Sequence, residues 1–250
     1  MPPKMSIGIA FLNLFFYGRL ILISFLYCFS IGLYRIAQLP FTPRKEWPLV
    51  WRRAIMGYGR TAIRFSSWPF VRIHFADLEP ERNEPGVVVA NHRSGSDGYF
   101  FGLLSQVGVQ VVNDWPFHLP FYGFFARRAG YFDIVNMKWD EFLSKTVSTI
   151  NDEACSVVGF PEGTRSARKE LLQFHGALFR VAMAAGCPVY PMIIIGTQDM
   201  PDRNFVMHPG TISIYKLPAV MPEVYKNWTA HKLKTHVRKI MAEEIEKRDP

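Results

Sequence analysis

Cysteine is scarce in this sequence and badly placed for cross-linking. The 250 residues contain only Cys28, Cys155 and Cys187, with no Cys-x-x-Cys pair. An odd number of cysteines, without a Cys/His ligand spacing, argues against both a disulfide framework and a zinc site. We therefore expect no bound metal, and a globular domain that faces the reducing cytosol.

Acidic residues are almost missing from the first 75 positions. This stretch holds ten lysines and arginines but only one acid, Glu46, whereas the remainder has 19 basic and 20 acidic residues. The basic excess is interleaved with apolar and aromatic side chains. That pattern favours an anionic membrane surface over a nucleic-acid groove, so we expect membrane lipids as partners and no nucleic acid.

Charge is also sparse between Ile7 and Leu39. The uninterrupted apolar run, Leu20 to Tyr34, has 15 residues and falls short of a hydrocarbon core of about 30 Å. It is either a short span whose flanking Arg19 and Arg35 reach the two interfaces, or a helix that lies in one leaflet. The tryptophans and arginines of segment 43–70 indicate an interfacial helix. We expect residues 1–68 to be a membrane-docking helical segment, with the following domain on the cytoplasmic face.

Beyond residue 68, strand and helix patterns alternate. The strands that we expect are Val71–Phe75, Gly86–Ala90, Val109–Asn113, Tyr131–Val135, Cys155–Phe160, Val189–Ile195 and Thr211–Tyr215. The helices that we expect are Gly98–Gln106, Pro120–Arg128, Lys138–Asp152, Leu171–Ala185 and Thr229–Arg248. This alternation predicts an α/β domain over residues 69–250, with a mixed, largely parallel sheet of about seven strands flanked by helices.

One predicted strand runs directly into polar residues. The stretch VVVANHRSGSDGYF begins with an apolar run typical of a strand buried on both faces, and continues with His92 and, five residues later, Asp97. Ligands bind beyond the carboxyl ends of such strands. Alternatively, Ser96 or Asp97 is the N-cap of the apolar helix that follows.

A second strand has the same design. It ends in FPEGTRS, which provides the carboxylate of Glu162, the unhindered amide of Gly163, the hydroxyl of Thr164 and the guanidinium of Arg165. The planar fork of an arginine can bind a phosphate through two hydrogen bonds. Taken alone, Pro-Glu-Gly is also compatible with an ordinary turn.

These two stretches carry a resemblance. NHRSGSD is similar to the Asn-His-x4-Asp motif, and FPEGTRS to the Phe-Pro-Glu-Gly-Thr-Arg-Ser motif, of the glycerolipid acyltransferases that include 1-acylglycerol-3-phosphate O-acyltransferase. Their separation of about seventy residues, and CPVYPMII in place of the family's fourth block, fit as well. The resemblance covers roughly residues 70 to 200. It also implies a membrane-docking helical element near the N terminus.

The chemistry of these side chains agrees with the resemblance. Neutral imidazole is a suitable base for an alcohol that attacks a thioester, so we expect His92 to be the general base and Asp97 to fix its tautomer. A serine nucleophile at Ser94 or Ser96 is less suited, because no Gly-x-Ser-x-Gly elbow is present. The resemblance implies that Glu162, Gly163, Thr164 and Arg165 bind substrate: Glu162 and Arg165 orient the acceptor, with Arg165 on its phosphate. The Gly163 amide is our candidate oxyanion donor.

The sequence departs from the family at the positions linked to acceptor recognition. Asn113-Asp114 stands where a lysine is usual, and Asn136 lies about where the family often has an arginine. Arg127 and Arg128 either substitute for these cations or are favourable charges at a helix C terminus. His175 occupies a place where family members often carry lysine, and we expect it near the site.

We therefore expect an acyltransferase that needs no cofactor. It moves a fatty acyl chain from acyl-CoA or acyl carrier protein, as co-substrate, to a hydroxyl of a lysophospholipid, foremost lysophosphatidic acid. The alternatives are another lysolipid, such as an aminolipid or a glycolipid, a thioesterase, and a non-catalytic lipid-binding protein of the same fold.

Overall fold

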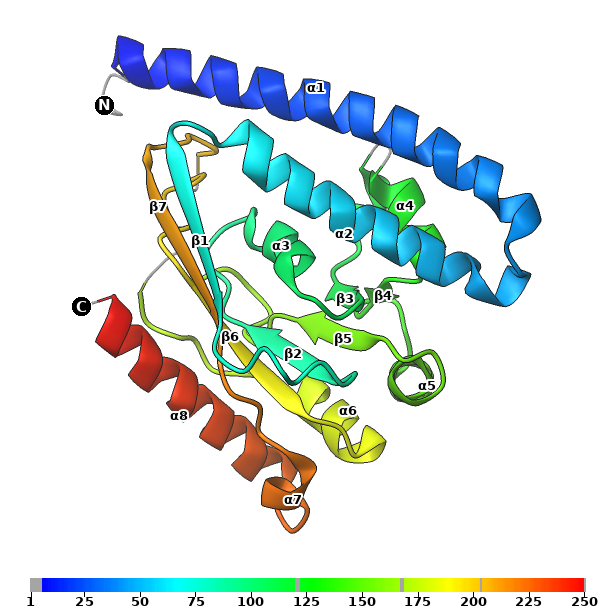
Figure 1. The fold of residues 1–250 in the computed structure, drawn as a ribbon. Helices are drawn as coiled ribbons and strands as arrows, with labels where there is room; N and C mark the ends of the chain where they lie inside the picture. The colour runs from blue at the N-terminus through cyan, green and yellow to red at the C-terminus, as the bar shows by residue number, and fades with distance from the viewer. Residues whose placement is uncertain (1–5, 120–121, 167–168, 203, 250) are drawn as a thin grey trace.

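The computed structural model describes residues 6–119, 122–166, 169–202 and 204–249. A single seven-stranded sheet forms its centre, and helices cover both faces of the sheet (Figure 1). The predicted α/β class, with a mixed and mostly parallel sheet, is confirmed.

The strands are joined in the order β1-β7-β6-β2-β5-β3-β4. Their bounds are β1 Val71–Asp77, β2 Val87–Ala90, β3 Gly108–Val112, β4 Phe132–Asp133, β5 Ser156–Gly159, β6 Val189–Ile195 and β7 Gly210–Lys216. All neighbours pair in parallel except β6 with β7. The carboxyl ends of β6, β2, β5, β3 and β4 therefore share one edge of the sheet.

The α-helices are α1 Ile7–Gln38, α2 Trp47–Ser66, α3 Asp97–Phe100, α4 Tyr122–Ala129, α5 Trp139–Asn151, α6 Ala177–Ala185, α7 Pro222–Tyr225 and α8 Ala230–Arg248. Short 3-10 turns lie at Leu39–Phe41, Arg44–Glu46, Phe101–Leu103 and Trp115–His118. The N termini of α1 and α8 are capped by side chains: Ser6 accepts from the Ile9 amide, and Thr229 accepts from the Lys232 amide.

The continuous apolar run of β2 is explained by burial on both faces. Val87 and Val89 belong to the cluster under α5, α6 and α8, whereas Val88 and Ala90 belong to the cluster under α2 and α3. All four side chains are completely buried. Successive strand residues point to opposite faces, so a strand between two helical layers has no position for a polar side chain.

Three predicted elements are longer than the observed ones. The helix expected over Leu171–Ala185 begins only at Ala177, because the preceding backbone hydrogen bonds to the FPEGTRS loop: His175 N–H donates to the Pro161 carbonyl. The helix expected over Gly98–Gln106 is one α-helical turn followed by a 3-10 turn, and the strand expected over Tyr131–Val135 keeps only two residues. Pro120, the first residue of another predicted helix, lies outside the described residues.

Helix α2 differs from the interfacial helix that we expected. One of its faces covers the sheet, with Trp51, Ile55, Met56 and Ile63 buried in the two clusters, while α1 lies against another side. The division that we expect after residue 68 therefore separates α2 from a core to which it contributes.

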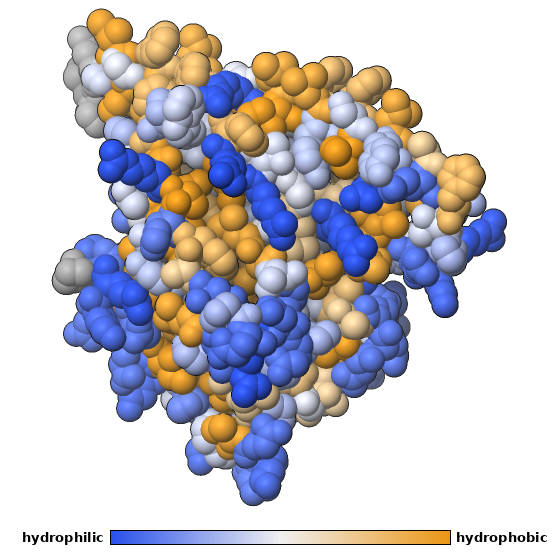
Figure 2. All heavy atoms as spheres, viewed as in Figure 1, coloured by the Kyte–Doolittle hydropathy of each residue, from blue (hydrophilic) through white to orange (hydrophobic). Residues whose placement is uncertain are grey.

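Helix α1 exposes a continuous apolar stripe. Large apolar side chains more than one-third exposed recur along it, with one gap between Phe15 and Ile21: Ile7, Phe11, Leu14, Phe15, Ile21, Leu22, Phe25, Leu26, Phe29, Leu33 and Ile36. Figure 2 shows this hydrophobic surface along the top of the molecule, whereas hydrophilic residues dominate the lower part near α8. By length and composition, the segment Ile7–Phe41 could also cross a membrane.

Candidate active site

His92 and Asp97 meet directly after β2, as the sequence predicts. His92 Nδ1 lies 2.9 Å from Asp97 Oδ2, and the same oxygen accepts hydrogen bonds from the amides of Arg93 at 2.6 Å and Ser94 at 2.8 Å. Asp97 is completely buried, while the His92 side chain is 19% exposed. Within the described part of the chain, no hydrogen bond involves His92 Nε2, so this nitrogen is available to a substrate.

The helix-cap interpretation of Asp97 is wrong. A capping side chain accepts from backbone amides two or three residues further along the chain, in the first turn of its helix. Asp97 instead accepts from residues that precede it, and Ser96, at the N-cap position, makes no side-chain capping bond. The carboxylate thus closes the turn 92–97 and orients the imidazole.

Asn91 fixes this turn to the neighbouring strand. Its side-chain amide donates to the Ile194 carbonyl at 2.8 Å, and its oxygen accepts from the Ile194 amide at 2.7 Å. Asn91 is completely buried at the end of β2. The position of His92 is therefore set by the sheet, because the residue before it is hydrogen bonded to β6 like a strand residue.

Glu162 joins the two motif loops. Its carboxylate accepts from the amides of His92 and Leu172, each at 2.8 Å, and the residue is buried. Burial raises the pKa of Glu162, although the two amide hydrogen bonds oppose this shift. We expected this carboxylate to orient the acceptor, but both of its oxygens are bound to backbone amides. It is placed as a brace between the loops.

Phe160 covers one face of the His92 imidazole. The rings of His92 and Phe160 are stacked with centroids 4.0 Å apart and planes 10° from parallel. Ser166 adds further contacts, since its amide donates to the His92 carbonyl at 2.8 Å. Phe160 was not among the predicted site residues, although it begins the FPEGTRS stretch.

Gly163 and His175 lie against each other. Gly163 has a positive φ of 69°, and a Cβ atom there would lie 3.0 Å from the His175 ring. The expected position of His175 near the site is confirmed. The Gly163 amide, however, donates to the Phe160 carbonyl at 3.1 Å, so our candidate oxyanion donor is already used within the turn.

Arg165 reaches back to the turn that carries His92. A Cβ atom on Gly95 would lie 3.4 Å from Arg165 Nη1, and both Arg165 and the neighbouring Thr164 are exposed. Among the residues that the structure describes, no carboxylate pairs with Arg165. Its guanidinium is therefore free to bind an anion beside His92.

An acidic cluster occupies the edge beyond β3 and β4. Asn136 Nδ2 donates to Asp133 Oδ2 at 2.7 Å and to Asp114 Oδ1 at 3.2 Å, and His118 Nε2 lies 2.9 Å from Asp114 Oδ2. Burial opposes ionisation of the Asp133 carboxyl, but hydrogen bonds from Asn136 and Val135 outweigh it and hold the pKa of Asp133 below its ordinary value. No lysine or arginine occupies positions 114, 133 or 136.

Arg127 and Arg128 have structural contacts. Arg127 Nη1 donates to the Phe117 carbonyl at 2.6 Å, and the Arg128 guanidinium lies over the Phe124 ring at 5.0 Å. Both are in the last turn of α4. This agrees with favourable charges at a helix C terminus rather than with substitutes for the missing cations.

The side chain of Arg93 is buried and ties three segments together. It donates to Asp249 Oδ2 at 2.9 Å, beyond the end of α8, and to the Lys169 carbonyl at 2.7 Å, after the FPEGTRS loop. Its side chain is 1% exposed. The backbone amide of the same residue binds Asp97, so Arg93 fixes the loops around the turn.

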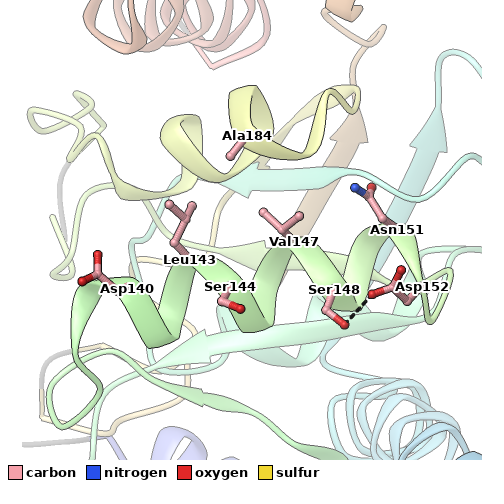
Figure 3. A pocket seen from close by; sticks show the side chains of 8 residues that line it. All are labelled: Asp140, Leu143, Ser144, Val147, Ser148, Asn151, Asp152 and Ala184. Carbon is pink, nitrogen blue, oxygen red and sulfur yellow. Dashed lines mark hydrogen bonds between the residues drawn. The ribbon is translucent and has the colours of Figure 1, made fainter.

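A groove on the surface lies away from both motif loops. It runs between α5 and α6 and is lined by Asp140, Leu143, Ser144, Val147, Ser148, Asn151, Asp152 and Ala184 (Figure 3). Ser148 Oγ is bonded to Asp152 Oδ2 at 2.7 Å, and Leu143 and Val147 point toward α6. No predicted site residue lines this groove.

Comparison with known proteins agrees with this geometry. The family model described as Acyltransferase matches residues 71–195, which include both motif loops. The chain belongs to the Acyltransferase family. Within it, this acyltransferase is similar to 1-acyl-sn-glycerol-3-phosphate acyltransferases.

Three relatives illustrate the similarity. The 1-acyl-sn-glycerol-3-phosphate acyltransferase of Limnanthes alba is 23% identical over 211 residues, 74% of each chain. That of Salmonella typhimurium is 27% identical and covers 70% of this acyltransferase and 71% of the relative. The crystal structure of PlsC from Thermotoga maritima, titled a 1-acyl-sn-glycerophosphate (LPA) acyltransferase, superposes with a TM-score of 0.77 at 21% identity over 96% of both chains. The fold of the acyltransferase is thus the PlsC fold.

Proposed function

We propose that the protein transfers a fatty acyl chain from a thioester, acyl-CoA or acyl carrier protein, to a hydroxyl of lysophosphatidic acid. The observation that carries the proposal is the His92–Asp97 pair at the carboxyl edge of the sheet, where the other imidazole nitrogen has no hydrogen-bond partner among the described residues. The names of the sequence relatives support the choice of acceptor. The reaction itself needs no cofactor.

The proposed reaction is a direct displacement. His92 Nε2 takes the proton of the acceptor hydroxyl as its oxygen attacks the thioester carbonyl carbon. A new C–O bond forms, the C–S bond of the tetrahedral intermediate breaks, and the proton passes from the imidazolium to the leaving thiolate. Asp97 stabilises the imidazolium through Nδ1.

Neither serine of the turn acts as a nucleophile in this scheme. Ser94 Oγ donates to the Pro201 carbonyl at 3.0 Å, and Ser96 Oγ donates to the Met200 carbonyl at 2.9 Å. A hydroxyl that donates its proton to a buried carbonyl is not activated by His92. Both contacts support a mechanism without an acyl-enzyme.

In this proposal, Arg165 binds the acceptor phosphate. Its exposed guanidinium lies beside Gly95 in the His92 turn, without a carboxylate partner in the described ranges. A terminal phosphate offers two oxygens to the guanidinium fork. Thr164, exposed next to it, can donate a further hydrogen bond to the same group.

The acidic cluster favours a second candidate acceptor. Asp114, Asp133 and Asn136 lie at the edge of the sheet where resemblance predicts cations. Carboxylates and amides bind amines and sugar hydroxyls, and they repel a phosphate dianion. A lysolipid with an amino or sugar headgroup is therefore the alternative to lysophosphatidic acid.

We further propose that α1 lies in one leaflet. A helix of 32 residues is about 48 Å long, more than the hydrocarbon core, and it contacts the domain along most of its length. Tyr27 Oη donates to the Ala54 carbonyl at 2.8 Å, and Gly32 touches the Phe125 ring. If α1 spanned the bilayer, the face that packs against the domain would have to enter the lipid. The exposed basic residues Arg44 and Lys45 support a cytoplasmic location for the domain.

The acceptor is tested with Arg165→Lys. Purified protein in detergent is given labelled acyl-CoA with lysophosphatidic acid, or with a lysolipid lacking a terminal phosphate, and products are resolved by mass. We expect the kcat/KM for lysophosphatidic acid, divided by that for the other lysolipid, to fall in the variant, because an ammonium cannot form the bidentate contact with the phosphate. Arg72→Lys, an exposed arginine on β1, is the matched control. An unchanged ratio would reject Arg165 as the phosphate ligand and favour the second acceptor.

A further inference from the structure

The segment 197–208 lies between the membrane-facing helix and the catalytic turn. It follows β6 at the same edge of the sheet as His92, and we call it the bridge loop. Residue 203 is outside its described part. Neither motif includes this loop, yet it contacts both α1 and the turn 92–97.

On one side, the bridge loop binds the catalytic turn. The Pro201 carbonyl accepts from Ser94 Oγ, and the Met200 carbonyl accepts from Ser96 Oγ. Ser94 is buried, and its backbone amide donates to Asp97 Oδ2. A displacement of the bridge loop would therefore move the amide that holds the catalytic carboxylate.

On the other side, the bridge loop binds α1. Asn13 Nδ2 donates to the Met207 carbonyl at 3.0 Å, and Asn13 Oδ1 accepts from the Met207 amide at 2.8 Å. Tyr17 Oη adds a hydrogen bond to the Phe205 carbonyl at 2.5 Å. Asn13 thus satisfies both backbone groups of a buried residue that is 194 positions away in the chain.

The two sides are connected within the loop. The His208 amide donates to the Asp199 carbonyl at 3.2 Å, and the Asp202 amide donates to the Val206 carbonyl at 3.0 Å. Asp202 Oδ1 also accepts from the Val206 amide at 2.9 Å. These cross-links join the half that α1 holds to the half that the serines hold, so the loop can transmit a shift from one end to the other.

Asn13 is a polar residue within the apolar helix α1. The exposed stripe of α1 is apolar, and an asparagine within such a helix is unfavourable both for helix formation and for contact with lipid. Asn13 lies on the side of α1 that faces the bridge loop, where its hydrogen bonds offset this cost. Its contacts serve the domain rather than the membrane.

We propose that Asn13 is a positioning residue for catalysis: through the bridge loop, it holds Ser94 and Ser96, and with them Asp97, in the geometry that orients His92. Helix α1 then has two roles, docking to lipid and bracing the catalytic turn. This inference rests on the proposed function, because it assigns a purpose to the His92–Asp97 geometry.

The first test separates bracing from docking. Asn13→Leu keeps the side-chain size and the apolar character of α1 but removes both contacts with Met207. We expect kcat to fall on the order of 10-fold in detergent micelles, while vesicle binding stays unchanged. The matched control is Ser24→Ala, which removes a different polar contact of α1, the hydroxyl bonded to Tyr58 Oη at 2.7 Å. Wild-type kcat in Asn13→Leu, or an equal loss in the control, would overturn the proposal.

A double-mutant cycle tests transmission through the loop. Asn13→Leu and Ser96→Ala act at opposite ends of the bridge loop, and independent sites would multiply their fold-losses in kcat. We expect the double variant to lose clearly less than the product, because either change alone already releases the loop. Multiplicative losses would contradict coupling through the loop.

A measurement without substrate keeps the inference separate from the proposed function. Amide hydrogen exchange of peptides covering residues 92–100 should be faster in Asn13→Leu than in wild type or Ser24→Ala. If Asn13→Leu folds poorly, Tyr17→Phe is the milder change: it removes the separate contact of α1 with the Phe205 carbonyl of the bridge loop and should give a smaller increase. Unchanged exchange in both variants would overturn the inference. A wild-type protein that transfers no acyl group would refute the proposed function instead.

Discussion

The imidazole of His92 lies flat against the ring of Phe160, with centroids 4.0 Å apart. Asp97 fixes one edge of the imidazole and Phe160 fixes one face, so the ring has little freedom to rotate about its side-chain bonds. An aromatic face also stabilises a developing imidazolium.

Phe160→Leu should therefore lower kcat more than it weakens substrate binding. Leucine keeps the apolar character of the position but neither supports the ring as a flat surface nor offers π electrons. We expect a loss on the order of 10-fold in kcat with little change in KM, measured by steady-state acyl transfer. A change confined to KM would mean that Phe160 contacts substrate rather than positioning His92.

Asp97→Asn should reduce kcat by about 10²–10⁴-fold. Asp97 Oδ2 receives His92 Nδ1 and the amides of Arg93 and Ser94, so an asparagine oxygen at this place keeps the contacts but loses the charge that stabilises the imidazolium. The reverse orientation places the NH2 group against both amides and against His92 Nδ1, where it selects the other imidazole tautomer. Nitrogen chemical shifts of the labelled imidazole would report this tautomer directly. Normal turnover together with a lowered melting temperature would indicate that Asp97 only stabilises the turn.

Glu162→Gln should weaken the hydrogen bonding that joins the two motif loops. A glutamine can accept only one of the two amides, from His92 and Leu172, and its NH2 group opposes the other. We expect the free energy of unfolding to fall by about 1–3 kcal/mol, measured by denaturant titration, with a parallel loss of kcat.

The stabilities of wild type and Glu162→Gln should also differ in their dependence on pH. Burial raises the pKa of Glu162 above its ordinary 4.5, so the native state binds this proton more tightly than the unfolded state. The stability that wild type gains from this proton is fully present below 4.5 and is lost as pH rises through the raised value. The difference in melting temperature between wild type and Glu162→Gln should therefore become smaller as the pH rises. A difference independent of pH across this window would contradict the assigned burial.

Membrane binding through α1 should resist salt. Apolar burial is not screened, whereas ions at 1 M reduce electrostatic reach to about 3 Å. In vesicle sedimentation, we expect wild type to stay bound at high salt and Phe25→Asp/Phe29→Asp to be released. Val224→Asp, an exposed apolar position on α7, is the control. Quantitative release of wild type by salt would rule out insertion of α1.

The pattern of the sequence predicts the sheet well because burial on both faces leaves a strong signal. The runs that became β2, β5 and β6 have no polar alternation, and the bounds of β6 agree at both ends. The sequence predicts too long a helix α6 because Leu171, Leu172 and Phe174 continue its apolar pattern. Their segment instead binds the Glu162 loop through long-range hydrogen bonds, which leave no periodic signal.

The site was predictable where side chains act locally. His92 and Asp97 are five residues apart, so a single turn brings them together. The structural roles of Glu162, Asn91 and Asn13 depend on partners 70 to 194 residues away, which no local pattern reveals. The hydrogen bond of the Gly163 amide to the nearby Phe160 carbonyl lies within a tight turn, and the sequence pattern did not indicate it.

His92→Ala tests the central claim most directly. The variant is purified alongside wild type, checked for unchanged melting temperature and vesicle binding, and assayed with labelled acyl-CoA and lysophosphatidic acid, with the ester product resolved by mass. The proposed mechanism predicts that ester formation falls by about 10²–10⁴-fold while the folded state and membrane binding persist. Ester formation at a near-wild-type rate by the folded variant would contradict His92 as the general base.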